Sequence, residues 1–258
     1  MKKIFSAAVT VMLIGCMLMT SGCGKNKNER AHLVEGDKTE TSNQTVNESD
    51  DAEDPGKSGK DAAQKASEQA QDKAAADSDI SMGTVSDNTY KNEYFKLACK
   101  LDSAWTFSSS SELLSAVNIN ADGLSADELT EKIKSVGMFY DMAASKQGGI
   151  PNISVGIQNV DMVYGSGISE EEIIDKTVSS LPAQMEKAGI SVEQCEASKT
   201  EFAGAQRNTI KTLIAQNGMK IYQTQVFVKK DSYMFAAAFT SDSFETNENL
   251  IKMFYKLN

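Results

Sequence analysis

The chain has 258 residues and carries 26 Lys and Arg against 36 Asp and Glu, which gives a formal net charge of −10. This excess of acidic residues argues against a general nucleic-acid-binding protein. Four cysteines exclude a disulfide-dense scaffold, and a single histidine leaves little for a metal site.

The first 22 residues are typical of an export signal. Lys2 and Lys3 give a basic start, an apolar run follows, and small residues precede Cys23. The stretch Met19–Cys23 resembles the lipobox of bacterial lipoproteins, which implies that the signal peptide is removed and Cys23 is lipidated. The stretch Leu13–Cys16 matches the lipobox letters slightly better, but further apolar residues follow Cys16, whereas a polar segment follows Cys23. A plain secretory signal with an incidental cysteine is the other interpretation.

The residue after the cysteine bears on the location of the protein. In lipoproteins of two-membrane bacteria an aspartate there is the usual signal for retention in the inner membrane, and this chain has Gly24. We therefore expect a protein that contacts the membrane through its lipid anchor on the extracytoplasmic face. This is the cytoplasmic membrane of a one-membrane cell, or the outer membrane if the source has two.

Residues 23–88 are predicted to be a disordered, acidic and Ala-rich tether that begins at the lipidated cysteine. Apart from Phe5, every aromatic residue of the chain lies at or after Tyr90. A segment without aromatic residues buries too little apolar surface to offset the entropy of ordering. As a flexible coil the tether would reach about 40–50 Å.

The third region, 89–258, is predicted to fold. Phe95, Leu97 and Cys99 alternate with other residues in the period-2 pattern of a strand with one buried face. Trp105 and Phe107 are expected to continue the same apolar face after a short break.

Helices are predicted from capping signals and apolar spacing. Ser125 stands three residues before Glu128, the spacing of a capping box. The clearest helix runs from the N-cap Ser169 to a stop at Gly189, with a kink expected at Pro182. The expected helices cover about 111–117, 125–136, 170–188 and 244–256.

Strands are expected between and after these helices, and Asn217-Gly218 is a strong hairpin signal. The sequence is rich in strands, has a few amphipathic helices and lacks βαβ regularity. It therefore predicts an α+β fold with a largely antiparallel sheet. The expected strands cover about 138–144, 153–157, 190–203, 205–215, 219–228 and 233–240.

The start of the folded region resembles the opening of the Mog1/PsbP-like fold. The similarity lies in Tyr90–Phe95, an aromatic-Asn-aromatic pattern, and in the step Leu101–Trp105, where Asp102 replaces the usual proline. The resemblance implies an antiparallel sheet flanked by helices, as in uncharacterised bacterial lipoproteins with this fold. It implies a binding or assembly role and transfers no catalytic residue.

Few residues of the folded region suit catalysis. The single histidine, His32, lies in the tether, so the folded region has no imidazole. This excludes Ser-His-Asp and Cys-His catalysis and every His-ligated metal site there. We expect no catalytic residue, no metal and no cofactor.

Two sets of residues remain open to interpretation. Cys99 and Cys195 are the thiols of the folded region, and Cys99 is expected to be a buried small hydrophobe. A Cys99–Cys195 disulfide and a reactive thiol are the alternatives. Trp105, Tyr94 and Phe107 are candidates for a ligand groove, although such aromatic clusters more often form a core.

The leading functional prediction is a membrane-anchored extracytoplasmic lipoprotein whose folded domain is a non-catalytic binding or assembly module. Its partner would be an unknown envelope protein or ligand, and not a nucleic acid. One alternative is an envelope enzyme of the glycan-hydrolase type, which uses only carboxylates. Another is a carrier of an apolar ligand, which needs a large cavity. Candidate acids for the enzyme are Asp102, Glu112, Asp141 and Asp161.

Overall fold

A computed structural model describes residues 80–216 and 218–258. The predicted signal peptide, the predicted lipidation site Cys23 and nearly all of the predicted tether lie outside these residues. The fold reaches back beyond the predicted boundary at residue 89, because Ile80 is buried and residues 84–86 form a strand. A strand of three residues is too short to show periodicity in the sequence.

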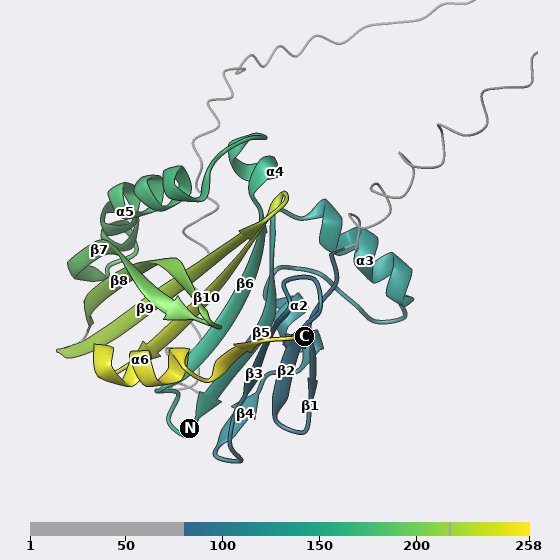
Figure 1. Ribbon diagram of the computed structural model, residues 1–258, viewed down its shortest axis with the longest axis horizontal. Coiled ribbons are helices and arrows are strands. Elements are labelled where there is room, and N and C mark those ends of the chain that lie inside the picture. Colours follow the sequence, from purple (N-terminus) through teal and green to yellow (C-terminus); the bar gives the residue numbers. More distant parts are fainter. Residues whose placement is uncertain (1–79, 217) are drawn as a thin grey trace, which may run out of the picture. The chain divides into compact units, whose positions relative to one another are not determined.

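Eleven strands are described, and they form two antiparallel sheets where the sequence predicted one (Figure 1). The α+β class and the antiparallel pairing are confirmed. The smaller sheet has the order β1-β2-β3-β11 and the larger has the order β4-β5-β6-β10-β9-β8-β7. The strands of the smaller sheet are β1 (Thr84–Ser86), β2 (Thr89–Asn92), β3 (Leu97–Lys100) and β11 (Phe254–Lys256). Those of the larger are β4 (Trp105–Phe107), β5 (Met138–Lys146), β6 (Asn152–Asn159), β7 (Ser191–Phe202), β8 (Ala205–Gln216), β9 (Met219–Lys230) and β10 (Tyr233–Ser241).

Helices α3 and α5 begin where their predicted capping residues place them. Helices α2, α3 and α5 each start with a complete capping box, in which a serine and a glutamate three residues later bond to each other's backbone. Helix α5 continues through Pro182 to Lys187. The short helix α4 was not predicted. The described helices are α2 (Ser110–Ser115), α3 (Ala126–Ser135), α4 (Val160–Tyr164), α5 (Glu170–Lys187) and α6 (Phe244–Ile251).

The prediction of a closing helix over 244–256 was partly wrong. Helix α6 ends at Ile251, and residues 254–256 form β11, which pairs with β3. Phe254 is buried, and its ring centroid lies 5.1 Å from that of Phe202 and 5.6 Å from that of Phe239. Packing among these rings favours the strand over the helical continuation that local spacing suggested.

Trp105 and Phe107 pack in the same apolar cluster as the first strands, but their strand lies in the other sheet. The chain turns at Asp102, whose carboxylate accepts from the backbone N–H of Ala104. Trp105 then pairs with Lys146, so β4 belongs to the larger sheet and not to the sheet that contains β3.

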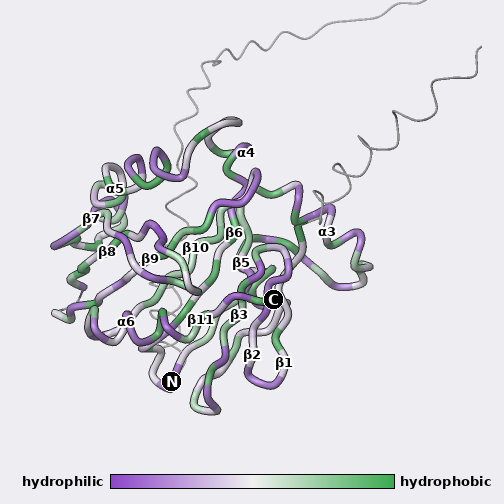
Figure 2. Tube along the Cα trace, viewed as in Figure 1, coloured by the Kyte–Doolittle hydropathy of each residue, from purple (hydrophilic) through white to green (hydrophobic). Residues whose placement is uncertain are grey.

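The core forms on both faces of the larger sheet, whose central strands carry long apolar stretches (Figure 2). One face packs against the smaller sheet and α6 in the main apolar cluster. On the other face, α5 packs on β7, β8 and β9 through its buried Ile173, Ile174, Leu181 and Met185. In the part of the chain that the structure describes, no helix is long and apolar enough to cross a membrane.

Candidate binding edge

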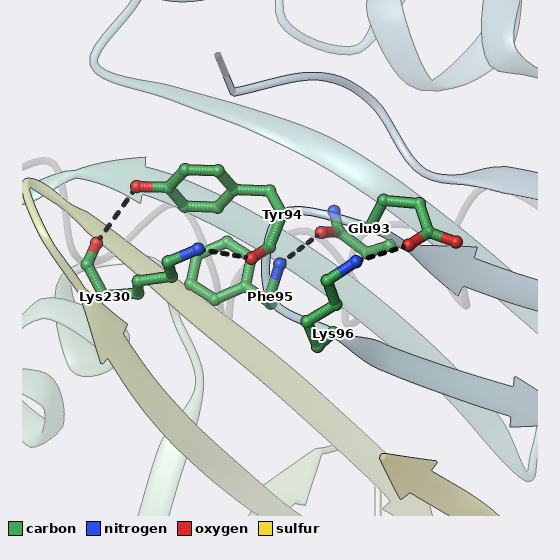
Figure 3. Close-up of polar contacts among 6 residues, drawn as sticks. Glu93, Tyr94, Phe95, Lys96 and Lys230 are labelled. Carbon is green, nitrogen blue, oxygen red and sulfur yellow. Dashed lines mark hydrogen bonds and ion pairs between the residues drawn. The ribbon is translucent and has the colours of Figure 1, made fainter. Parts of the chain in front are cut away.

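Tyr94, a candidate groove residue, joins the two sheets. It lies in the turn between β2 and β3, and its hydroxyl donates to the Lys230 carbonyl (3.4 Å) and to Asp231 Oδ2 (3.0 Å). The Lys230 ammonium donates to the Tyr94 carbonyl at 2.8 Å and lies 4.2 Å from the ring centroid (Figure 3). Tyr94 therefore holds the β2–β3 turn against the β9–β10 hairpin.

Trp105 and Phe107, the other candidate groove residues, lie near the opposite end of the larger sheet. Trp105 is buried opposite the last residue of β5, beside the start of β6, and the Lys146 ammonium lies 5.5 Å from its ring centroid. Tyr94 contacts Lys230 at the β9–β10 turn. This turn leads into Tyr233, which pairs with Asn159 at the end of β6, so Tyr94 lies near that end. The eight residues of β6 span roughly 23 Å. The structure therefore does not bring the three aromatic residues together in one groove.

The two cysteines of the folded region are free thiols in this structure. Cys99 is fully buried in β3, and this burial raises its pKa to about 12. Cys195 lies in β7 of the other sheet, where its thiol is 3.9 Å from the Val178 carbonyl. Burial also raises the pKa of Cys195. A raised pKa disfavours the thiolate, so neither environment activates a nucleophile.

Three of the four candidate acids have structural roles at the ends of elements. Asp102 bonds to the backbone of its own turn. Glu112 closes the capping box of α2, and its hydrogen bonds from Ser109 lower its pKa. Asp161 accepts from the Ser232 hydroxyl at 2.7 Å.

Asp141, the fourth candidate acid, is 2% exposed on β5. Its carboxylate accepts from the Gly83 backbone N–H at 2.6 Å, from Asn92 Nδ2 at 2.8 Å and from the Tyr90 hydroxyl. Burial raises the pKa of Asp141, and the three hydrogen bonds oppose that shift. Among the described residues, no second carboxylate contributes to the shift in the pKa of Asp141. Among these residues, no three His, Cys, Asp or Glu gather where they could hold a metal ion.

The strand β7 presents a long open edge. It has 12 residues and pairs only with β8, since no other described strand bonds to its outer side. Six of the residues between 191 and 201 have exposed side chains. Strands with unpaired backbone groups are templates for an additional strand.

The turn between β7 and β8 determines which backbone groups point outward. Phe202 pairs with Ala205 across the two residues Ala203 and Gly204, whose φ angles are 50° and 79°. Such a two-residue turn makes the flanking pair a hydrogen-bonded one, and bonding then alternates along the ladder. The N–H and C=O groups that face away from β8 therefore belong to Cys195, Ala197, Lys199 and Glu201. We call these outward groups the β7 edge.

Helix α5 borders this edge. It runs antiparallel to β7, since Val178 contacts Cys195 while Pro182 and Glu186 approach the start of the strand. Residues three or four apart share one side of a helix. The side of α5 toward the β7 edge, which we call the α5 flank, therefore carries Glu171, Asp175, Val178, Pro182 and Glu186.

A hollow of about 370 Å³ opens where α5 ends and β7 begins. Its walls combine apolar side chains with one carboxylate, and it lies beside the first residues of β7, before the β7 edge begins. It is lined by Pro182, Glu186, Gly189, Ile190, Ser191 and Val192.

The sequence predicts both of the elements that form this edge but does not show that the strand is outermost in its sheet. The alternating pattern over 190–203 indicates a strand but not its place in the sheet order. One available signal is the run of charged residues Glu193, Glu196, Lys199 and Glu201, because charges are common on edge strands.

No family model matches the chain, and no curated protein matches it. One similar solved structure is cyanobacterial PsbP (CyanoP) from Synechocystis sp. PCC 6803, with 10% identity and a TM-score of 0.42 over 68% of this chain and 97% of that chain. Another is LpqN, involved in cell envelope biogenesis of Mycobacterium tuberculosis, with 10% identity and a TM-score of 0.30 over 63% of this chain and 83% of that chain.

Proposed function

We propose that this chain is a lipid-anchored extracytoplasmic binding or assembly module, and that the β7 edge is where it contacts a partner protein. The observation that carries the proposal is the length of the unpaired edge. Strands β1, β4 and β11, which are the other sheet edges, have three residues each, whereas β7 has 12.

Natural sheets protect their edges by shortness, charge or bulges. Strand β7 uses the last two, because a register shift lies between Val192 and Gln194 and four of its residues are charged. From Gln194 to Phe202 the pairing with β8 is regular. The strand therefore keeps a regularly paired stretch that a partner segment could extend, while its charges oppose pairing with unrelated strands.

The membrane part of the proposal rests on the sequence. The lipobox-like residues before Cys23 support lipidation, and the polar segment 24–79 supports presentation of the folded region away from the membrane surface. The anchor holds the module in place, and the β7 edge supplies the contact.

Neither alternative function gains comparable support from the described residues. The acid with a raised pKa, Asp141, is enclosed by three hydrogen-bond donors, whereas a glycan hydrolase needs a second carboxylate across a cleft. Trp105, under which an apolar carrier would need its cavity, packs within the main apolar cluster.

A proline substitution on the edge tests this function. Ala197 is exposed and its N–H points away from β8, so Ala197→Pro removes an outward donor without removing a ladder hydrogen bond. Partners crosslinked to the anchored protein in its native cell would be compared for the wild type, A197P and the control A197S. We expect A197P to lose partners that A197S retains, at similar thermal stability. The same partners at wild-type yield in A197P would contradict the proposal.

A further inference from the structure

We infer that the segment bound at the β7 edge is an extended, basic polypeptide. Its side chains that face α5, which come from every second residue, are Lys or Arg. This inference rests on the proposed function of the same edge. It adds the chemistry of the partner, which the open backbone alone does not define.

The charge of the folded region is concentrated at this site. Residues 170–202, which include α5 and β7, carry eight acidic and three basic side chains. The rest of 89–258 carries 13 of each, so the whole net negative charge of 89–258 belongs to these two elements and their connection. A partner at this edge would meet a negative field, which favours and steers a positive one.

Three of these acidic side chains already form hydrogen bonds or an ion pair within the protein. Glu170 accepts from Asn208 Nδ2 at 2.7 Å and from the Lys229 backbone N–H at 2.9 Å. Glu172 closes the capping box of α5. Glu193 forms an ion pair with Lys220 at 2.9 Å.

The exposed acids of the α5 flank stand beside the edge without an ion pair among the described contacts. Glu171, Asp175 and Glu186 belong to this flank, and Glu201 lies on the same side of the sheet. Glu171 has one contact, at 3.5 Å, with the Asn208 amide. These carboxylates line the side on which an added strand would place every second side chain.

The spacing of the first two acids suits a strand. Glu171 and Asp175 are four residues apart on a helix, which is about 6 Å along its axis. Side chains on one face of a strand repeat every two residues, or about 6.8 Å. Lysines at positions i and i+2 of the partner would therefore face the two carboxylates in turn.

The hollow at the start of β7 fits the same kind of side chain. Pro182, Ile190 and Val192 provide apolar contact for an aliphatic stem, and the Glu186 carboxylate can pair with a cationic head. Lys and Arg are the side chains that combine these two features.

A second copy of the chain is a poorer occupant of the same edge. Two-fold pairing of β7 with itself would place both α5 flanks on one face of the combined sheet. The carboxylates of the two flanks would then face each other, and like charges in such positions are destabilising.

The test uses the full-length protein in detergent and fluorescent ten-residue peptides in which Thr alternates with Lys or with Glu. We expect the Lys peptide to bind, the Glu peptide not to bind, and A197P to abolish binding. The double reversal Asp175→Lys with Glu186→Lys should weaken binding by about tenfold or more, because each surface charge contributes a modest amount. The control reversal Asp122→Lys with Glu131→Lys, which lies in α3 and in the segment before it, should leave the affinity unchanged.

Any of four results would overturn the inference. The first is equal affinity for the two peptides, and the second is binding of the Lys peptide that A197P does not reduce. The third is a concentration-dependent dimer that A197P abolishes, which would make a second copy the occupant. A Lys peptide that fails to bind, while A197P still loses its partners in the cell, would refute the basic partner and leave the proposed function standing.

Discussion

The carboxyl group of Asp141 links β5 to the first strands of the chain through donors that are distant in sequence. Gly83, Tyr90 and Asn92 lie 58, 51 and 49 positions before it. Asp141 sits at the register shift between Tyr140 and Met142, where the bulge frees its side chain from the regular alternation of β5. The sequence identified Asp141 as a candidate acid, but it gave no sign of its partners, because only the folded chain brings them together.

Stability should depend on pH through this carboxyl group. Because burial raises its pKa above 3.8, the folded protein binds this proton more tightly than the unfolded chain. The stability from this group is therefore complete below pH 3.8 and is lost as the pH rises through the folded-state pKa. We expect the free energy of unfolding of the wild type, measured by denaturation at a series of pH values, to fall as the pH rises above 3.8. Asp141→Asn should lose this slope. An unchanged slope in D141N would assign the pH dependence to another group.

Gly83 gives a second test at the scale of a single residue. A Cβ atom there would lie 2.4 Å from Tyr90 Cε2 and 2.8 Å from the Lys91 carbonyl oxygen. We expect Gly83→Ala to lower the free energy of unfolding by about 1–3 kcal/mol, because backbone and a buried ring must move. The exposed neighbour Ser81 supplies the control, S81A, which should unfold like the wild type. Equal stability of the two variants in denaturant would contradict the packing at Gly83.

Among the secondary-structure elements, local signals predicted some well and others poorly. Ser125 and Ser169 start α3 and α5 as predicted, because a capping box lies within four residues of chain. The hairpin at Gly218 is confirmed by the pairing of Gln216 with Met219. Strand β11 was missed, because its preference over a helix comes from the rings around Phe254.

The openness of β7 depends on the order of the whole sheet. That order places β10 beside β6, across a gap of more than 70 residues in the chain, and leaves β7 outermost. Periodicity in one segment carries no information about such pairing. Both elements of the candidate binding edge could therefore be predicted from the sequence, whereas the outermost place of β7 had only its charged residues as a signal.

Amide hydrogen exchange should reveal the open edge directly. The N–H groups of Ser198 and Thr200 bond to β8, whereas those of Ala197 and Lys199 point outward. In NMR exchange of the full-length protein without a partner, we expect slow exchange at the first two and fast exchange at the last two. Uniformly slow exchange along β7 would mean that another segment already covers its outer side.

For the whole molecule, function requires both the anchor and the edge. The sequence predicts that Cys23 carries the lipid, so Cys23→Ala should abolish metabolic labelling with palmitate. The matched variant Cys16→Ala should keep the label, because the signal peptide that contains Cys16 is removed. Loss of the label in C16A but not in C23A would assign the lipid to Cys16. Label in both single variants would refute a unique site at Cys23.

The most direct test of the binding edge places a photoreactive amino acid at Lys199 in the full chain within its native cell. The comparison position is Lys132 on α3, which is exposed and far from β7 in the sequence. We predict that residue 199 crosslinks to a protein partner through an extended basic segment, that residue 132 does not, and that A197P abolishes the crosslink from 199. Equal crosslinking from both positions, or none from 199, would contradict the assignment of β7 as the binding edge.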